Sequence, residues 1–187
     1  LGDVYKRQLI GSETLNKSGS VSTSSPNAST YGSASINESL LSLSDGSNGG
    51  LISNYTLLGG SHSITISKKS VGADGSKVYD GNTSASSSNL SLTGLIGSET
   101  LNLSGSGTIT TSAVGDNKNV TNVNLTLSDN SGSAANYILN GTLEINVTER
   151  PVVISGSKVY DGNTTVDGSS LTTFSNLVGS ETLSVSG

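Results

Sequence analysis

One stretch of eight residues constrains the fold of this chain more than any other feature, because it occurs twice. Ser76–Thr83 reads Ser-Lys-Val-Tyr-Asp-Gly-Asn-Thr, and the same residues recur unchanged at Ser157–Thr164, 81 positions further along the 187-residue chain. A signature repeated at this distance predicts a series of similar units, and not one fold built around one active site.

Two further landmarks repeat with nearly the same spacing. The first reads Leu-Ile-Gly-Ser-Glu-Thr-Leu, with valine in place of isoleucine in its last copy, and the second is an Asn-Tyr pair. The copies of the first are Leu9–Leu15, Leu95–Leu101 and Leu177–Leu183, and those of the second are Asn54-Tyr55 and Asn136-Tyr137. Together the landmarks predict units of about 80 residues.

These blocks resemble the YDG-type repeat of large bacterial surface and secreted adhesins, the filamentous-haemagglutinin-like exoproteins. That repeat is a relative of the mostly bacterial Ig-like modules called MBG. The residues that carry the resemblance are the signature Lys77–Thr83, the apolar pair and glycine of Leu95–Glu99, the central block Val114–Thr121 and the Asn-Tyr block Ala134–Leu139. The resemblance covers Ser70–Gly187 and extends only partly to the residues before it, which lack a Tyr-Asp-Gly.

The repeat pattern divides the chain into four parts. We expect one complete repeat at residues 70–150, between a truncated repeat at residues 9–69 and another at residues 151–187. Residues 1–8 match no other copy and contain two of the nine basic residues, Lys6 and Arg7. We expect these eight residues to be a non-native leader and leave them out of the fold.

Apolar and polar residues alternate over many short runs, as Val123, Leu125 and Leu127 show, and no stretch has a helical period. The expected strands of the complete repeat are Ser76–Tyr79, Leu90–Leu92, Leu101–Leu103, Thr108–Thr111, Val120–Ser128, Tyr137–Leu139 and Leu143–Val147. The pattern predicts an all-β fold of tandem small antiparallel β-sandwiches, which the resemblance makes Ig-like. A β-grasp-like unit and a parallel β-helix are the alternatives.

We expect the repeated residues to determine the fold rather than to bind a ligand. Asp-Gly is a strong tight-turn signal, because glycine supplies positive φ and aspartate can accept a hydrogen bond from the backbone two residues on. The residues given this structural role are Lys77, Tyr79, Asp80, Gly81 and Asn82, their second copies Lys158, Tyr160, Asp161, Gly162 and Asn163, and also Glu99, Asp116, Lys118, Asn136 and Tyr137.

Three alternatives stay open for these residues. Tyr79 and Asp80 would form a ligand or metal site if every repeat bound a ligand. The scarce charged residues would form one ion-pair network per unit, or lie separately in solvent. A Lys–Asn isopeptide crosslink, as in some Gram-positive surface domains, would need both residues beside a carboxylate in the core.

Composition excludes several functions. The net charge of −5 argues against nucleic acid as a partner, and the lack of cysteine excludes disulfides and thiolate metal sites. No apolar run approaches the ~20 residues of a membrane span. His62 is the only histidine, and no catalytic motif surrounds it. We expect no enzymatic activity and no cofactor.

The function that these observations favour is a structural stalk. The repeats would project the distal adhesive region of a large extracellular bacterial protein from the cell surface, with neighbouring repeats of the same chain as partners and the host-cell surface contacted through other regions. Short junctions, such as Glu149-Arg150-Pro151, would stiffen the array. The alternatives are weak binding of host glycans or proteins by many repeats together, and accessory domains of a secreted enzyme.

Overall fold

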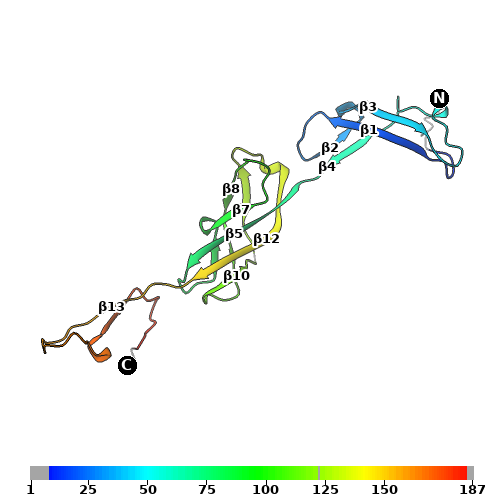
Figure 1. The fold of residues 1–187 in the computed structure, drawn as a ribbon. Helices are drawn as coiled ribbons and strands as arrows, with labels where there is room; N and C mark the ends of the chain where they lie inside the picture. The colour runs from blue at the N-terminus through cyan, green and yellow to red at the C-terminus, as the bar shows by residue number, and fades with distance from the viewer. Residues whose placement is uncertain (1–8, 122, 185–187) are drawn as a thin grey trace. The chain divides into compact units, whose positions relative to one another are not determined.

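The structure is a computed structural model that describes residues 9–121 and 123–184, so the predicted leader, residues 1–8, lies outside the described residues. The described residues form β-strands joined by loops and short 3-10 turns, without an α-helix (Figure 1). The all-β prediction is therefore confirmed. In the same part of the chain, no helix has the length and apolar character needed to span a membrane. The chain divides into two compact units, of which the first ends at Lys69 and the second begins at Ser70.

The first unit is built from two antiparallel strand pairs. β1 (Leu15–Thr23) pairs with β3 (Ile36–Asp45), and β2 (Ser29–Gly32) pairs with β4 (Ser63–Ile66). Two 3-10 turns, η1 (Ser33–Ser35) and η2 (Ile52–Asn54), connect the strands. Among the described residues of this unit, the buried apolar side chain is that of Tyr31.

The centre of the second unit is a four-stranded sheet in the order β10-β12-β5-β7 (Figure 1). Its strands are β5 (Lys69–Val78), β7 (Leu90–Thr93), β10 (Gly115–Asn119) and β12 (Tyr137–Thr148). β5 and β7 form an antiparallel pair, as do β10 and β12.

β5 and β12 run in parallel, unlike the strands of the purely antiparallel repeat that the alternation predicted. Near the start of both strands, Ser70 donates a hydrogen bond to Asn140. Near the end of both strands, the Tyr79 N–H donates to the Thr148 carbonyl, at 2.9 Å. Contacts that advance in the same direction define a parallel pair, and the two arrows in Figure 1 point the same way.

Smaller antiparallel pairs complete the second unit. They are β8 (Leu101–Ser104) with β11 (Thr126–Asp129), β6 (Ser84–Ser86) with β9 (Ser106–Thr108), and β13 (Val153–Ser155) with β14 (Thr173–Ser175). The 3-10 turns are η3 (Ser87–Asn89), η4 (Ala134–Asn136) and η5 (Gly168–Ser170).

Two apolar clusters fill the second unit. One lies toward the end of β12 and includes Ile145 and Val147, and the other lies toward its start, around Tyr137. The first cluster also buries Ala73, Ala85, Leu90, Ile109 and Val120, and the second buries Val71 and Leu101. Alternate residues of β12 therefore supply the core, as the period of two predicted.

Several strand boundaries differ from the prediction. β5 begins at Lys69 and not at Ser76, and β9 ends at Thr108, although the Ile109 N–H still donates to the Thr83 carbonyl at 2.9 Å. Tyr137–Leu139 and Leu143–Val147 belong to one strand, because Gly141 lies so close to β5 that a Cβ there would be 2.9 Å from the Val71 carbonyl carbon. Gly141 therefore allows two strands to lie close together and does not form a turn between two strands.

Val120–Ser128 is the reverse case, in which one predicted strand is broken. The Val120 N–H donates to the Leu143 carbonyl on β12, whereas the Asn124 N–H donates to Ser106, which lies in β9. The chain thus moves from one sheet to another between β10 and β11. The alternation shifts phase at the same place, because Thr121 and Asn122 are two consecutive polar residues between Val120 and Val123.

Candidate functional site

The Tyr-Asp-Gly signature forms a turn directly after β5. The hydrogen bond from Tyr79 to Thr148 holds the start of the turn against β12. Gly81 has φ +75°, a conformation that L side chains adopt only under strain. One Asp80 carboxylate oxygen accepts the Asn82 N–H at 3.1 Å, and the other accepts the Asn82 side-chain amide at 2.8 Å.

Lys77 closes the turn from inside. Its Nζ donates to the Asn82 carbonyl and Asn82 Oδ1, both at 3.0 Å, and to the Ser84 carbonyl at 2.9 Å. It also lies 2.8 Å from Asp80 Oδ1, and its side chain is only 4% exposed. A buried ammonium group is costly unless its protons have partners, and this one is surrounded by oxygen acceptors.

The environment of Asp80 shifts its pKa. Partial burial favours the protonated acid, but the hydrogen bond from Lys77 and that from the Asn82 N–H outweigh this effect and hold the pKa of the carboxyl below its ordinary value. The ion pair and the turn are therefore coupled, because the same carboxylate accepts bonds from both.

The second copy of the signature makes the same turn. Lys158 Nζ lies 2.9 Å from Asp161 Oδ1 and donates to the carbonyls of Asn163 at 2.8 Å and Thr165 at 2.6 Å. The Asn163 N–H and Lys158 lower the pKa of Asp161. Gly162 has φ +80°. The Lys158 side chain is 24% exposed, however, against 4% for Lys77.

In both copies the lysine Nζ contacts the aspartate and donates to two carbonyls of the turn, in a buried and in a more open setting, so the local sequence specifies this turn. Lys77 and Asn82 do lie beside a carboxylate, the arrangement that an isopeptide crosslink would require. Nζ nevertheless points its protons at oxygen atoms, and an amine whose charge is held by four acceptors is not an activated nucleophile. Among residues 9–121 and 123–184, no group of metal-ligating side chains accompanies the turn.

A second repeated arrangement joins a tyrosine to a glutamate. The Tyr137 hydroxyl donates to Glu99 and accepts the Ile96 N–H at 3.3 Å. In the first unit, the Tyr55 hydroxyl donates to Glu13 and accepts the Ile10 N–H, also at 3.3 Å. We call each arrangement a tyrosine–glutamate clamp. In both, the hydrogen bond to the carboxylate raises the pKa of the phenol, with burial adding to the shift.

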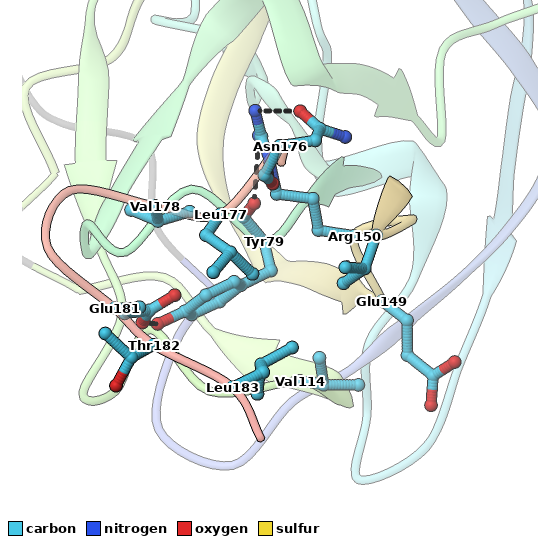
Figure 2. Close-up of a pocket in the computed structure, with 11 residues that line it drawn as sticks. Tyr79, Val114, Glu149, Arg150, Asn176, Leu177, Val178, Glu181, Thr182 and Leu183 are labelled. Atoms are coloured by element: carbon cyan, nitrogen blue, oxygen red, sulfur yellow. Dashed lines mark hydrogen bonds between the residues drawn. The ribbon is translucent and has the colours of Figure 1, made fainter. Parts of the chain in front are cut away.

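The signature turn also faces the next copy of the repeat. The Tyr79 hydroxyl donates to Glu181, and a Cβ added to Gly81 would lie 2.7 Å from Val178 Cγ1. The hydrogen bond to Glu181 raises the pKa of the Tyr79 phenol. Figure 2 shows the Tyr79 ring lying among the side chains of residues 177–183.

Arg150 fastens the same contact. Its Nε donates to the Asn176 carbonyl at 2.7 Å, and its Nη2 donates to Asn176 Oδ1 at 2.8 Å. Its Nη1 donates to the Tyr79 carbonyl at 3.4 Å, so one guanidinium group joins the turn to the next copy (Figure 2). The Asn176 side chain in turn donates to the Pro151 carbonyl at 2.6 Å.

The other predicted residues lie apart from these contacts. Asp116 is exposed and Lys118 half-buried on β10, and neither belongs to an ion pair within the described ranges. Asn136 ends η4, directly before Tyr137. Tyr160 is almost fully exposed. One ion-pair network per unit is therefore not formed by these side chains. The Lys77–Asp80 pair stands without Glu99, which contacts Tyr137.

The predicted site residues did not include Arg150, Asn176, Val178 and Glu181, although Arg150 lies in the predicted junction and the repeated landmark Leu177–Leu183 contains Val178 and Glu181. A signal for Asn176 was present: it stands where the preceding copy has Gly94, and both residues have positive φ. An asparagine tolerates that conformation and adds an amide that glycine lacks.

The comparisons with known proteins agree with part of the resemblance. The model of the YDG domain family matches residues 61–144, which include the first signature turn and the clamp of Glu99 and Tyr137. Neither a curated protein nor a solved structure matched the chain.

Proposed function

We propose that this chain is a series of spacer repeats in the stalk of a large bacterial cell-surface or secreted adhesin. In this proposal the repeats are small Ig-like β-sandwiches that hold a distal adhesive region away from the cell. Each repeat acts mechanically, and its partners are the neighbouring repeats of the same chain.

The observation that carries the proposal is the contact between Tyr79 and Arg150 of one copy and residues 176–181 of the next. Side chains of the signature thus have a role outside their own copy. A motif that fixes a turn and also touches the following repeat is what a linear array requires, because each repeat interacts mainly with its neighbours.

The two ends of the complete repeat differ in a way that supports an array. The clamp of Glu99 and Tyr137 lies where β12 begins, and the signature turn lies beside Thr148, where β12 ends. A strand of this length spans about 35 Å. Unlike ends allow head-to-tail addition of repeats without limit, whereas like ends would close into pairs.

Small-angle X-ray scattering tests the proposal. The full chain would be extended by inserting one, three or seven further copies of Ser70–Arg150 before Pro151. A stiff spacer predicts a radius of gyration that grows almost linearly with the number of repeats. Flexibly joined repeats would follow an exponent of about 0.6, as unfolded chains do.

A matched series carries Tyr79→Ala and Arg150→Ala in every copy. These substitutions remove the junction contacts and change none of the buried residues of the two core clusters, although the Tyr79 ring also packs against the first cluster, so unfolding by urea is measured beside the scattering. We expect the exponent to fall in this series only. Equal exponents near 0.6 in both series would contradict the spacer function. A cell-surface display assay adds a cellular test. The distance from the cell surface at which a fused binding domain captures its ligand should increase with the number of repeats.

A further inference from the structure

The dipeptide Asn-Gly occurs twice in the chain, as Asn48-Gly49 and as Asn140-Gly141. This is a reactive setting for an asparagine side chain, because glycine has no Cβ that would keep its backbone nitrogen away from the side-chain amide. The two copies lie in opposite environments, one in an exposed loop of the first unit and the other within β12.

Asn48 and Gly49 are the central residues of a tight turn that follows β3. The Gly50 N–H donates to the Ser47 carbonyl at 3.2 Å, and the two residues between them have φ of +57° and +86°. Both are exposed, and no described residue accepts a hydrogen bond from the Gly49 N–H. The described part of the chain therefore leaves this nitrogen free to approach the Asn48 side chain.

The loop does not need these two residues in order to close. In the complete repeat the corresponding loop, after β11, runs directly from Ser131 to Gly132 without an Asn-Gly between them. There the Asn130 N–H donates to the Gly132 carbonyl at 3.1 Å, as the Gly46 N–H donates to the Gly50 carbonyl at 2.9 Å. Asn-Gly favours tight turns, but here it extends a loop that closes without it.

Asn140, in contrast, is held by the sheet. Gly141 packs so closely on β5 that a Cβ there would lie 2.9 Å from the Gly72 nitrogen, and Ser70 donates to the Asn140 side-chain oxygen. Cyclisation requires the backbone to bend toward the side chain, so a strand inside a four-stranded sheet has to open locally before its asparagine can react.

We propose that Asn48 is a site of spontaneous deamidation. The Gly49 backbone nitrogen attacks Asn48 Cγ, and the new C–N bond closes a succinimide ring. The side-chain amide nitrogen leaves as ammonia with the proton that Gly49 loses. Water then opens either C–N bond of the ring and leaves aspartate or isoaspartate at this position. The reaction needs no reactant besides water, and the inference is independent of the spacer function.

The product places a hydrogen-bond acceptor where the loop has a donor. Asn48 Nδ2 donates to the Ser12 carbonyl at 2.9 Å, and the Thr14 N–H donates to the Ser47 carbonyl at 3.1 Å. These bonds fasten the loop to the residues before β1. A carboxylate cannot donate to a carbonyl, so deamidation removes the first of them.

The new carboxylate also forms near an existing one. Glu13 Oε1 would lie 3.8 Å from a Cβ on Gly49, and like charges at short range repel each other. Glu13 is the glutamate of the tyrosine–glutamate clamp with Tyr55. Deamidation at Asn48 therefore loosens the loop from the segment that carries the clamp of the first unit.

Peptide mass spectrometry of the full 187-residue chain tests the proposal. The chain is incubated in mildly alkaline buffer and digested at intervals, and the conversion of amide to acid is quantified at Asn48 and Asn140. Isoaspartate is identified from its fragmentation pattern. We expect Asn48 to convert at least about tenfold faster than Asn140, because the strand has to open first. In urea-unfolded chain the two rates should converge. Equal rates in the folded chain, or faster conversion of Asn140, overturn the proposal.

Hydrogen exchange measures the consequence for the loop. The Thr14 amide should exchange several-fold faster in the deamidated chain and in Asn48→Asp than in the unmodified chain. Asn130→Asp adds the same charge to the corresponding loop of the second unit and should leave the Thr14 amide unchanged. Unaltered exchange at Thr14 after deamidation would contradict the loosening of the loop. None of these results would alter the scattering exponent that tests the spacer.

Discussion

Among the described residues of the second unit, Lys77 is the buried charged side chain. The oxygen atoms around its Nζ belong to Asp80, Asn82 and Ser84, which follow within the next seven residues of the chain. The stem of the lysine packs beside the core, and its ammonium group organises the turn. Asp161 and the Asn163 carbonyl stand at the same offsets from Lys158, and the Thr165 carbonyl takes the place of that of Ser84. The role of the lysine in the signature is thus to supply protons to a turn that would otherwise leave carbonyl groups inside the protein unpaired.

Replacing this lysine should destabilise the second unit. Lys77→Met keeps the apolar stem but leaves the Asn82 and Ser84 carbonyls without their donor, which costs about 1–3 kcal/mol of unfolding free energy. Urea denaturation of the full chain measures the loss. Lys158→Met is the matched control, and because Lys158 is more exposed, its effect should be clearly smaller. Equal losses would show that burial of the ammonium group is irrelevant.

The lowered pKa of Asp80 predicts a dependence of stability on acid. A carboxyl whose pKa is lower in the folded than in the unfolded chain stabilises the fold above the unfolded pKa of about 3.9, and this contribution is lost as the pH falls through the folded pKa. The unfolding free energy should therefore decrease below about pH 4. The decrease should be smaller in Lys77→Met, because the ion pair is absent, and unchanged in Asp116→Asn.

Gly81 and Gly162 allow the turn and the junction to be separated. Alanine at either position meets the same strain of a positive φ, about 1–2 kcal/mol. Only Gly81→Ala also pushes a Cβ against Val178. We expect both variants to lose similar stability, but only Gly81→Ala to shift the methyl resonances of Val178 in NMR spectra. A matching shift in Gly162→Ala would contradict the contact.

At the level of the strand, β12 connects both clusters and belongs to the central sheet. Ile145 is fully buried on it, and Ile138 on the same strand is exposed. Ile145→Ala should lower the unfolding free energy by about 2–5 kcal/mol, because it opens a cavity in the core. Ile138→Ala should change it by less than about 0.5 kcal/mol. Chemical denaturation of the two variants measures both losses. Similar small losses in the two variants would show that the core around β12 is not tightly packed.

The sequence was sufficient to predict an all-β chain, because alternation is a local property that Leu101–Leu103 and Leu143–Val147 display directly. It was insufficient where partners change. Val120–Ser128 contacts two sheets, and the consecutive polar residues Thr121 and Asn122, which interrupt its alternation, were not used to divide it. The parallel pairing of β5 with β12 was hidden, because it joins residues about 70 positions apart.

For the signature turn and the clamp, the sequence likewise predicted the residues but not the contacts between them. Repetition identified Lys77, Asp80, Glu99 and Tyr137 as a set, but it could not show which residue contacts which. The bond between Tyr137 and Glu99 links separate landmarks, and that between Tyr79 and Glu181 links separate copies. Such contacts depend on the packing of the whole unit.

Across the whole molecule, the two units differ in how much apolar surface they bury. The second unit has two clusters, whereas Tyr31 is the buried apolar residue in the described part of the first. Hydrogen exchange should therefore protect the amides of β5 and β12 far more than those of β1 to β4, because strands without a core open locally. Mass spectrometry of peptides after exchange measures this. Equal protection would contradict the difference in burial.

The parallel pairing of β5 and β12 has a consequence for force. The chain enters residues 70–150 through β5 and leaves them through β12, so tension along the chain pulls these neighbouring strands past each other in opposite directions. The hydrogen bonds between them are then loaded together in shear, and none can open before the rest. Resistance to pulling is governed by the rate of unfolding and not by equilibrium stability. A unit with a small core thus resists tension through the hydrogen bonds between β5 and β12, which are the bonds that the tension loads.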